Sequence, residues 1–432
     1  MKFSFLRSLA LSIGWMFVLV TALFHPGSVN ATGSVAEVIP NDPYWSHQWY
    51  LRQIHAPAAW SATTGSASVI VAVLDTGIDI THPDIRENIW TNTKEIPDDQ
   101  IDNDRNGYVD DVHGWSFVNN TPAIQPVKTL DQSLQAYSHG TAVASLIGAR
   151  GNDGVGIAGV AWNVRIMPLV VLDADGSGHL DGLLNAIRYA VNQGAQIINL
   201  SLAGVDYDEN LDQLMRRVAQ ANVLIVVATG NDPRTKTGLN LNTTPVYPAC
   251  MDGNINAVLG VSGTDTLDQK APYANAGSAC TDLSAPAQQI FAARPIDTQT
   301  STTFPGYFPS LTGTSLAAPL VSGVAALIKS LQPTWTAQQI RDRLIATADP
   351  VEDSTVMVPG RLGAGRLNAA KALEGLIPAP VSTSSTPLFI ASTTSSTSPV
   401  IKKSVKKSPS SKIRLKKQRI RPVISLIKPR WI

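Results

Sequence analysis

The sequence predicts an α/β protein with a doubly wound, mainly parallel sheet and helices on both faces. Two observations favour this class. Short apolar runs suited to buried strands recur along the chain, at 69–74, 164–172, 197–200, 223–228 and 257–261. Amphipathic stretches typical of helices lie between them, at 139–149, 180–193 and 211–221. Strands that alternate with helices form βαβ units, whose strands run parallel.

The first strand run is apolar and rich in β-branched residues along its whole length, which suits a strand covered on both faces. Asp75 follows this run directly, and Asn231 follows the run at 223–228 by three residues. In open parallel sheets, ligands bind at the carboxyl ends of the strands. Both polar residues are therefore predicted to lie where such a sheet carries its chemistry.

Two further helices are predicted after the last strand run, at 314–331 and 337–347. Pro319 lies inside the first of them, where it removes a backbone donor and should bend the helix. The globular pattern then ends near Leu376.

A chain of 432 residues can hold one large domain or two ordinary ones, with tails. Its hydrophobic fraction of 44% and charged fraction of 16% allow a sizeable core and exclude overall disorder. The patterns divide the chain into a signal peptide at 1–31, a globular domain at 40–377, a Ser/Thr/Pro-rich linker at 378–400 and a basic tail at 401–432. The tail is expected to be disordered.

The predicted signal peptide begins with Lys2 and Arg7, followed by an apolar run at 9–23 and a small-residue cleavage site that ends at Ala31. The run is short for a spanning helix, which favours a cleaved signal over a retained anchor. The protein is therefore expected to be secreted or associated with the cell surface. An oxidising compartment would permit a disulfide between Cys250 and Cys280, and two buried free thiols are the alternative.

The tail differs in charge from the rest of the chain. It holds twelve Lys or Arg and no acid, so residues 1–400 carry −11 while the whole chain carries +1. A basic tail of this kind suits an anionic cell-surface polymer or lipid head groups. Trp431 is its only aromatic residue, which disfavours base stacking and specific binding of nucleic acid.

Three residues offer the chemistry of acyl transfer: Asp75 in V-L-D-T-G-I-D, His139 in S-H-G-T-A-V-A and Ser315 in G-T-S-L-A-A-P. The reaction needs a hydroxyl that attacks, a base that takes its proton and a carboxylate that orients the base. His139 and Ser315 are each expected to begin a helix, so that N–H groups at Ser315 point toward a developing oxyanion. Asn231, in V-V-A-T-G-N-D, is the neutral second donor. Each residue alone would more often be a cap or turn residue.

The four motifs, in this order, resemble those of the subtilisin-like (subtilase) serine peptidases, in particular the thermitase-like branch. The resemblance extends over about 40–373 and includes N-D-P-Y-W near its start and G-A-G-R-L-N-A-A-K-A-L near its end. It implies a sheet of about seven parallel strands and endopeptidase activity on polypeptide substrates. Asp75, His139 and Ser315 would form the triad, with Asn231 in the oxyanion hole.

The resemblance also assigns two stretches that would bind an extended substrate by β-augmentation. They are Gly176-Ser177-Gly178 and Ser201-Leu202-Ala203. Ala203 replaces a glycine of the family pattern, so its methyl group is expected to narrow the cleft. Ala142 stands where a second histidine is common, at a position outside the triad.

Calcium binds six to eight oxygen ligands, a mixture of carboxylates and carbonyls. The resemblance implies a strong calcium site with three acidic ligands, Asp42, Asp84 and Asp153, and with carbonyls from Arg150, Val155 and Ile157. Three unrelated cap or turn residues are the alternative.

A second calcium site is indicated by the residues themselves. The spacing reproduces the first half of an EF-hand loop, with the candidate ligands Asp102, Asp104, Asn106 and Asp110. Its twelfth position holds His113 in place of Glu, and Asp111 could substitute. A solvated acidic loop is the alternative.

Two other functions remain open: an inactive binding protein that keeps the fold, and a processing enzyme that acts on one partner. Family members usually carry a folded propeptide, whereas residues 32–39 alone separate the predicted cleavage site from N-D-P-Y. Either the enzyme folds unaided, or that part lies outside this sequence. We expect a monomer.

Overall fold

The computed structural model describes residues 37–128, 134–232, 234–235, 237–251, 258–296, 303–351 and 360–376, together with the backbone of 426–427. The chain separates into two units, Met1–Val35 and Ala36–Ile432. The predicted signal peptide, the linker and all but two residues of the predicted tail lie outside the described residues.

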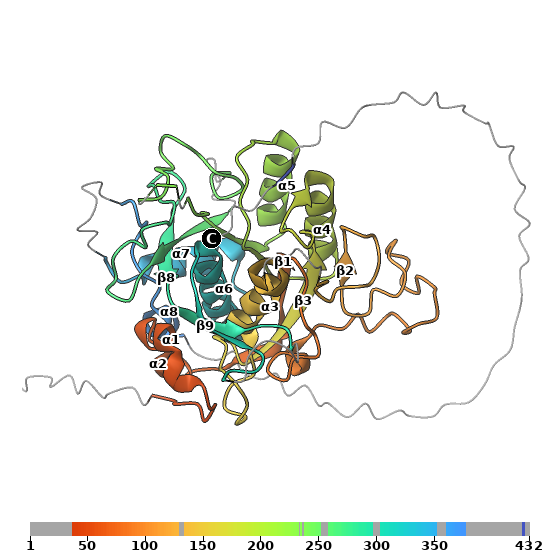
Figure 1. The fold of residues 1–432 in the computed structure, drawn as a ribbon, viewed down its shortest axis with the longest axis horizontal. Coiled ribbons are helices and arrows are strands. Elements are labelled where there is room, and N and C mark those ends of the chain that lie inside the picture. The colour runs from red at the N-terminus through yellow and green to blue at the C-terminus, as the bar shows by residue number, and fades with distance from the viewer. Residues whose placement is uncertain are drawn as a thin grey trace, which may run out of the picture. The chain divides into compact units, whose positions relative to one another are not determined.

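A seven-stranded sheet lies at the centre of the fold, and every neighbouring pair of its strands is parallel (Figure 1). In spatial order the strands are β2 (Trp115–Ser116), β3 (Asn163–Val170), β1 (Gly65–Asp75), β5 (Ile197–Leu200), β6 (Leu224–Ala228), β7 (Leu259–Thr264) and β8 (Leu283–Pro286). The chain extends from β1 to β3 on one side and from β5 to β8 on the other. The strand order therefore reverses beside β1, where doubly wound sheets bind their ligands.

Two small two-stranded sheets flank the main one. They are formed by β4 (Gly178–His179) with β11 (Leu426–Ile427), and by β9 (Ile290–Ala293) with β10 (Tyr307–Leu311). Both pairs are antiparallel. β11 is the part of the predicted tail that the structure describes.

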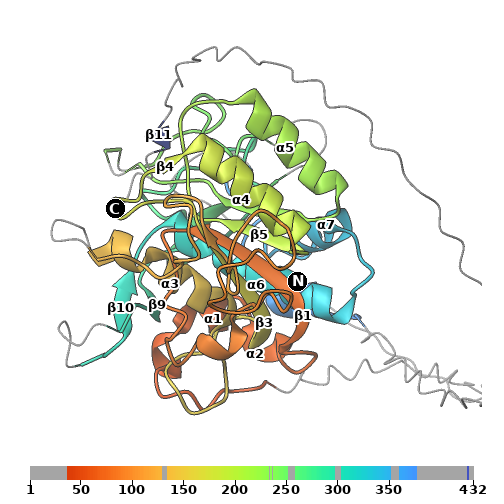
Figure 2. The same ribbon diagram turned by 90° about the vertical axis from the view of Figure 1, so that its right-hand side faces the viewer.

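The α-helices of the described residues are α1 (Trp49–Gln53), α2 (Ala56–Ala59), α3 (Leu134–Gly148), α4 (Leu180–Asn192), α5 (Glu209–Gln220), α6 (Thr314–Leu331), α7 (Ala337–Ala346) and α8 (Ala369–Leu373). Two 3₁₀ turns come before β2 in the chain, η1 (Trp45–His47) and η2 (Arg86–Asn88). α3 and α6 cover one face of the sheet, and α4 and α5 cover the other (Figures 1 and 2).

The side chains of β1 alternate between the two faces of the sheet, and this explains why helices cover both faces. Val71 and Val73 belong to the core that contains α3 and α6, whereas Ala72 and Leu74 belong to the core with α4 and α5. Because successive side chains of a strand point to opposite faces, an apolar run throughout buries both faces. The predicted fold class, with helices on both faces of a parallel sheet, is confirmed.

The structure corrects the predicted start of one helix. His139 was expected to begin it, but α3 already includes Leu134, so that His139 lies in its second turn. Gly140 allows this helix to pack closely: a Cβ there would lie 2.3 Å from the carbonyl oxygen of Gly77. Of the other predicted elements, 197–200 and 314–331 have the observed bounds, and the rest differ by at most four residues at either end.

α6 runs through the interior of the domain. In the described part of the chain it is the one helix long and apolar enough to cross a membrane, and 89% of it is buried inside the protein. Burial of this extent is what a core helix of a globular domain shows. Ser315 stands in its first turn, so the predicted nucleophile is held by the most buried helix of the fold.

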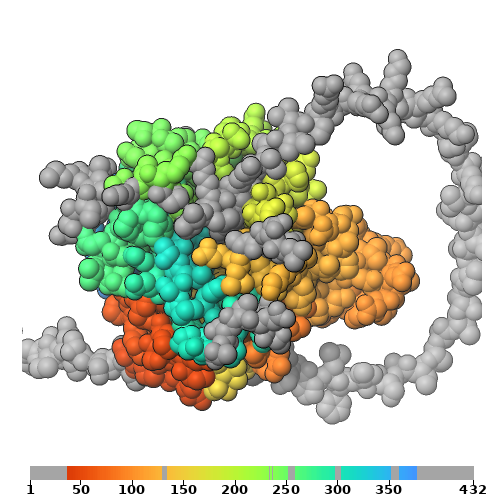
Figure 3. Space-filling model, in the orientation of Figure 1, coloured from red at the N-terminus to blue at the C-terminus, as the bar shows by residue number. Residues whose placement is uncertain are grey.

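Residues far apart in sequence meet around β9. Figure 3 shows the N-terminal residues, in red, beside the cyan residues near 290. The hydroxyl of Tyr50 donates to the carbonyl oxygen of Phe291 (2.6 Å), and the rings of Tyr44 and Phe291 lie 5.5 Å apart. The structure also joins Cys250 and Cys280 in a disulfide, which resolves the two alternatives left by the sequence.

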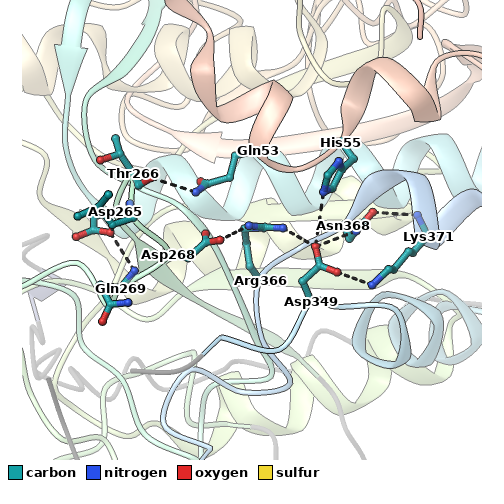
Figure 4. A network of polar contacts seen from close by, with 11 residues as sticks. Gln53, His55, Asp265, Thr266, Asp268, Gln269, Asp349, Arg366, Asn368 and Lys371 are labelled. Atoms are coloured by element: carbon teal, nitrogen blue, oxygen red, sulfur yellow. Dashed lines mark hydrogen bonds and ion pairs between the residues drawn. The ribbon is translucent and has the colours of Figure 1, made fainter. Parts of the chain in front are cut away.

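A polar network joins the two ends of the domain (Figure 4). Arg366 forms ion pairs with both Asp268 and Asp349. Asp349 also accepts hydrogen bonds from Lys371 (2.6 Å) and Asn368 (2.9 Å). Burial acts to raise the pKa of Asp349, but these donors together lower it below the usual value. The pKa of Asp268, which has Arg366 as its cationic partner, is raised because burial outweighs that one pairing.

Asp349→Asn should destabilise the protein at neutral pH. The lowered pKa means that the ionised carboxylate stabilises the fold above the unfolded pKa, and that this effect is lost as the pH falls through the folded pKa. We expect a loss of about 1–3 kcal/mol at pH 7 that shrinks toward pH 3, measured by denaturant unfolding in a Ser315→Ala background. Asp342→Asn, an exposed acid on α7, is the control. An equal loss at both pH values would contradict the assignment.

Candidate active site

Asp75 and His139 meet at the carboxyl end of β1. The Nδ1 atom of His139 lies 2.8 Å and 2.9 Å from the two carboxylate oxygens of Asp75. The carboxylate also accepts the backbone N–H of Thr76 (2.7 Å). Asp75 is 1% exposed and His139 8% exposed. A buried carboxylate in this position favours the tautomer with the proton on Nδ1, which leaves Nε2 to act as the base.

The residues that follow His139 fix α3 against the loop after β1. Gly140 has no side chain to collide with Gly77, and its N–H donates to the hydroxyl of Thr76 (3.3 Å). The hydroxyl of Thr141 accepts the N–H of Asp79 (3.0 Å). The H-G-T motif therefore combines one functional side chain with two residues that bring the helix close to Asp75.

Ser315 lies at the N-terminal end of α6, and its hydroxyl donates to the carbonyl of Ser201 (3.2 Å). Pro319 stands four residues further on and has no N–H to donate to the carbonyl of Ser315. The hydroxyl of Ser201 donates to that carbonyl instead, at 2.8 Å. Pro319 thus frees an acceptor that then links α6 to the end of β5.

This link is supported by a buried chain of hydrogen bonds. The side-chain amide of Asn199 donates to the hydroxyl of Ser201 (2.9 Å), and its carbonyl oxygen accepts from the hydroxyl of Ser322 on α6 (2.8 Å). Asn199, Ser201 and Ser322 are all 1% exposed or less. The chain begins and ends on α6, so it fixes both the position and the rotation of the helix that carries Ser315.

Asn231 faces the same end of α6. Its Oδ1 accepts the backbone N–H of Thr314 (3.0 Å), which leaves the NH₂ group to donate elsewhere. A Cβ placed on Gly313 would lie 3.4 Å from Asn231 Nδ2 and 3.9 Å from the backbone nitrogen of Ser315. The absent side chain of Gly313 therefore leaves open space between two N–H donors. An oxygen with developing negative charge fits such a space.

One pocket brings these groups together. His139, Asn231 and Ser315 line it, as do Ala142 and several residues of the segment before α6, namely Phe308, Leu311, Thr312 and Gly313. A base, a hydroxyl and an oxyanion donor therefore open into one cavity, although their side chains come from α3, α6 and the loop after β6.

The two predicted substrate-binding stretches also lie at this end of the sheet. Ser201 and Leu202 directly follow β5, and Ala203 lies beside the loop with Asn231, since a Cβ on Gly230 would come within 3.0 Å of the Ala203 methyl group. The other stretch, 176–178, closes a turn in which Ser177 and Asp173 are joined backbone to backbone (2.7 Å). That turn starts at Val171 and Leu172, whose N–H groups donate to the carbonyl of Asp75.

Asp42, Asp84 and Asp153, the acids of the first predicted calcium site, lie near enough to one another to interact electrostatically. Burial first, and then the charge of nearby Asp153, raise the pKa of Asp42 to about 6 and that of Asp84 to about 7. The Oδ1 atoms of Asp42 and Asp84 are buried and accept no hydrogen bond from any described residue. Buried carboxylate oxygens without donors fit a hard cation such as calcium.

The second acidic loop is arranged differently from its prediction. Asp102 uses both carboxylate oxygens to accept the N–H groups of Asn106 and Gly107. The acidic cluster consists of Asp104 with Glu95 and Asp111, whose ligand atoms lie within 4.8 Å of one another. Neither Asp102 nor Asp110 belongs to it. The side-chain amide of Asn106 donates to Asp111 (2.9 Å), and the buried Oδ1 of Asp110 has no donor among the described residues.

Several functional contacts were missed from the sequence. Ser201 was predicted only as a substrate contact, and neither Asn199 nor Ser322 was singled out. Glu95 lies seven residues before the EF-hand-like spacing, where a template of fixed length does not reach. The one available signal was Pro319, since a proline four residues after Ser315 leaves that carbonyl in need of another donor.

Comparison with known proteins agrees with this geometry. The model of the subtilase family matches residues 66–365. Thermitase of Thermoactinomyces vulgaris is 33% identical over 336 residues, which cover 78% of this chain and 99% of the relative. Subtilisin of Bacillus pumilus is 30% identical over 298 residues, or 69% of this chain and 90% of the relative. A solved protease structure from Pseudoalteromonas arctica superposes with a TM-score of 0.60 at 25% identity, over 78% of this chain and 98% of that one.

The family match covers the segment that holds Asp75, His139, Asn231 and Ser315. The chain therefore belongs to the subtilase family and is a subtilisin-like serine endopeptidase, related to thermitase.

Proposed function

We propose that this endopeptidase cleaves polypeptides through a triad of Asp75, His139 and Ser315, with Asn231 in the oxyanion hole. The observation that carries the proposal is the paired His139–Asp75 contact at the pocket that also contains Ser315 and Asn231.

In this mechanism the Oγ of Ser315 attacks the carbonyl carbon of the scissile bond, and its proton passes to Nε2 of His139. Asp75 keeps Nδ1–H oriented and stabilises the imidazolium that forms. His139 then gives the proton to the leaving amine as the C–N bond breaks. Water, activated by the same histidine, hydrolyses the acyl-enzyme and restores Ser315.

The oxyanion of each tetrahedral intermediate would lie in the open space beside Gly313. There it would accept hydrogen bonds from Asn231 Nδ2 and from the backbone N–H of Ser315. The bond between Asn231 Oδ1 and Thr314 supports this role, because it orients the amide before substrate arrives.

We assign the enzyme to an extracytoplasmic location. The predicted signal peptide at 1–31 supports this, as does the Cys250–Cys280 disulfide, since such bonds persist in oxidising compartments.

Calcium is the proposed structural ion. Asp42, Asp84 and Asp153 would hold one ion, and Glu95, Asp104 and Asp111 a second. A bound cation would offset the mutual repulsion of these carboxylates and would act on stability alone, since neither cluster lines the pocket.

A fluorophosphonate probe should label Ser315, and Ser315→Ala should abolish the labelling. The probe reacts with a serine whose hydroxyl is activated by a neighbouring base. Peptide mapping by mass spectrometry identifies the modified residue. Absence of labelling in folded, calcium-loaded protein would support the rival function of an inactive binding protein.

Asn231→Ala should reduce kcat by about 10²–10³ and change KM little, because the lost hydrogen bond forms only in the transition state. Steady-state kinetics with a peptide substrate measure both constants. Asn185→Ala, at an exposed position on α4, is the matched control and should retain full activity. A rise in KM without a fall in kcat would assign Asn231 to substrate binding.

Calcium titration of the Ser315→Ala protein should show two bound ions. Asp84→Asn should remove one and Glu95→Gln the other, since each replaces a charged ligand of a different cluster. Isothermal titration calorimetry gives the number of ions, and exposed Asp181→Asn on α4 is the control. An unchanged stoichiometry in either variant would contradict the corresponding site.

A further inference from the structure

The edge of β4 pairs with the C-terminal part of the same chain. Leu426 lies opposite His179 and Ile427 lies opposite Gly178, in antiparallel register. Figure 2 shows β11 beside β4, although the two strands are far apart in the sequence. This pairing is a backbone interaction, of the kind by which an extended peptide adds to an exposed strand.

β4 is a rigid edge. Asp173 fixes the preceding turn, because its Oδ1 accepts the N–H groups of Asp175 and Ser177, both at 2.9 Å. On its inner side, Gly178 forms a bridge with Leu172. A Cβ on Gly178 would lie 2.4 Å from the carbonyl oxygen of Val171, so the close approach requires glycine. The other side of β4 remains available to a further strand.

This edge is attached directly to the proposed active site. The turn begins at Val171 and Leu172, and both N–H groups donate to the carbonyl of Asp75, at 2.9 Å and 3.2 Å. A strand that adds to β4 therefore lies close to the triad. Gly178 is also the last residue of a stretch that the sequence assigned to substrate. Substrate and β11 would thus use the same backbone edge.

Charge complementarity favours the C-terminal segment as the strand that pairs with this edge. Three exposed acids surround the edge: Asp173, Asp175 and Asp181. The segment 421–430 contains three cations, Arg421, Lys428 and Arg430, and no acid. Opposite charges steer two surfaces together and fix which partner binds.

The connection is long enough for this contact. Residues 377–425 link the last described residue of the domain to β11. A chain of that length can reach at most about 160–175 Å. Because this docking is intramolecular, its occupancy does not depend on the protein concentration.

We propose that the edge Gly178–His179 is a docking site for the chain's own segment 421–430, which competes there with polypeptide substrates. The competition with substrate rests on the proposed function, whereas the docking rests on the strand pairing. The two parts are tested by separate measurements.

Hydrogen exchange tests the docking without catalysis. In full-length Ser315→Ala protein, the peptide that contains Gly178 and His179 should exchange about 3–10 times more slowly than in the same protein with Leu426→Pro and Ile427→Pro, since proline removes the N–H donors of β11. Ile413→Pro with Leu415→Pro, in the same tail, is the matched control and should keep the protection. Equal exchange in all three proteins would overturn the docking site.

Kinetics test the competition. In active full-length protein of verified intact mass, the Leu426→Pro/Ile427→Pro variant should show an apparent KM about 2–10 times lower for a neutral peptide, with kcat unchanged. An unchanged KM would overturn the competition. If none of the proteins that keep Ser315 reacts with the fluorophosphonate probe, the proposed function fails. The hydrogen-exchange result would still decide whether the segment docks. Equal exchange, combined with binding to anionic vesicles that depends on the tail, would make the tail a surface anchor.

Discussion

The position of Ser315 depends on one buried link between α6 and β5. Pro319 leaves the carbonyl of Ser315 without a helical donor, and Ser201 supplies one from the end of the strand. Asn199 then connects Ser201 back to Ser322 on α6. Because these groups are buried, a lost partner would leave an unsatisfied polar atom, which costs more than the bond itself contributes. The nucleophile is therefore placed by the sheet as much as by its own helix.

The parallel sheet gathers the remaining groups at one end. Asp75 ends β1, Ser201 follows β5 and Asn231 follows β6, so three neighbouring strands deliver a carboxylate, an anchor and an oxyanion donor. Small residues permit the close distances: Gly140 brings α3 to the loop after β1, and Gly313 leaves space between two donors. The site thus follows from strand order together with the absence of particular side chains.

Much of this arrangement could be predicted from the sequence, because the information is local. The strand runs are continuous and apolar, and each of the four motifs lies within seven residues. What could not be predicted depends on distant partners. The Asn199–Ser322 contact, the approach of Glu95 to Asp111 and the Cys250–Cys280 bond require knowledge of which loops meet. The start of α3 at Leu134 was also missed.

The network around Asp349 has a consequence for survival in a solution of identical proteases. His55, which follows α1, lies 3.8 Å from Asp349, and Asn368, which precedes α8, donates to the same carboxylate. Beside them, the N–H of Ala369 donates to the carbonyl of Ile54 (2.7 Å). Chain ends are where proteins fray and where proteolysis usually begins. With both ends of the domain fastened to each other, cutting by a neighbouring molecule requires the opening of a larger unit. Resistance to self-digestion then follows the stability of the whole domain.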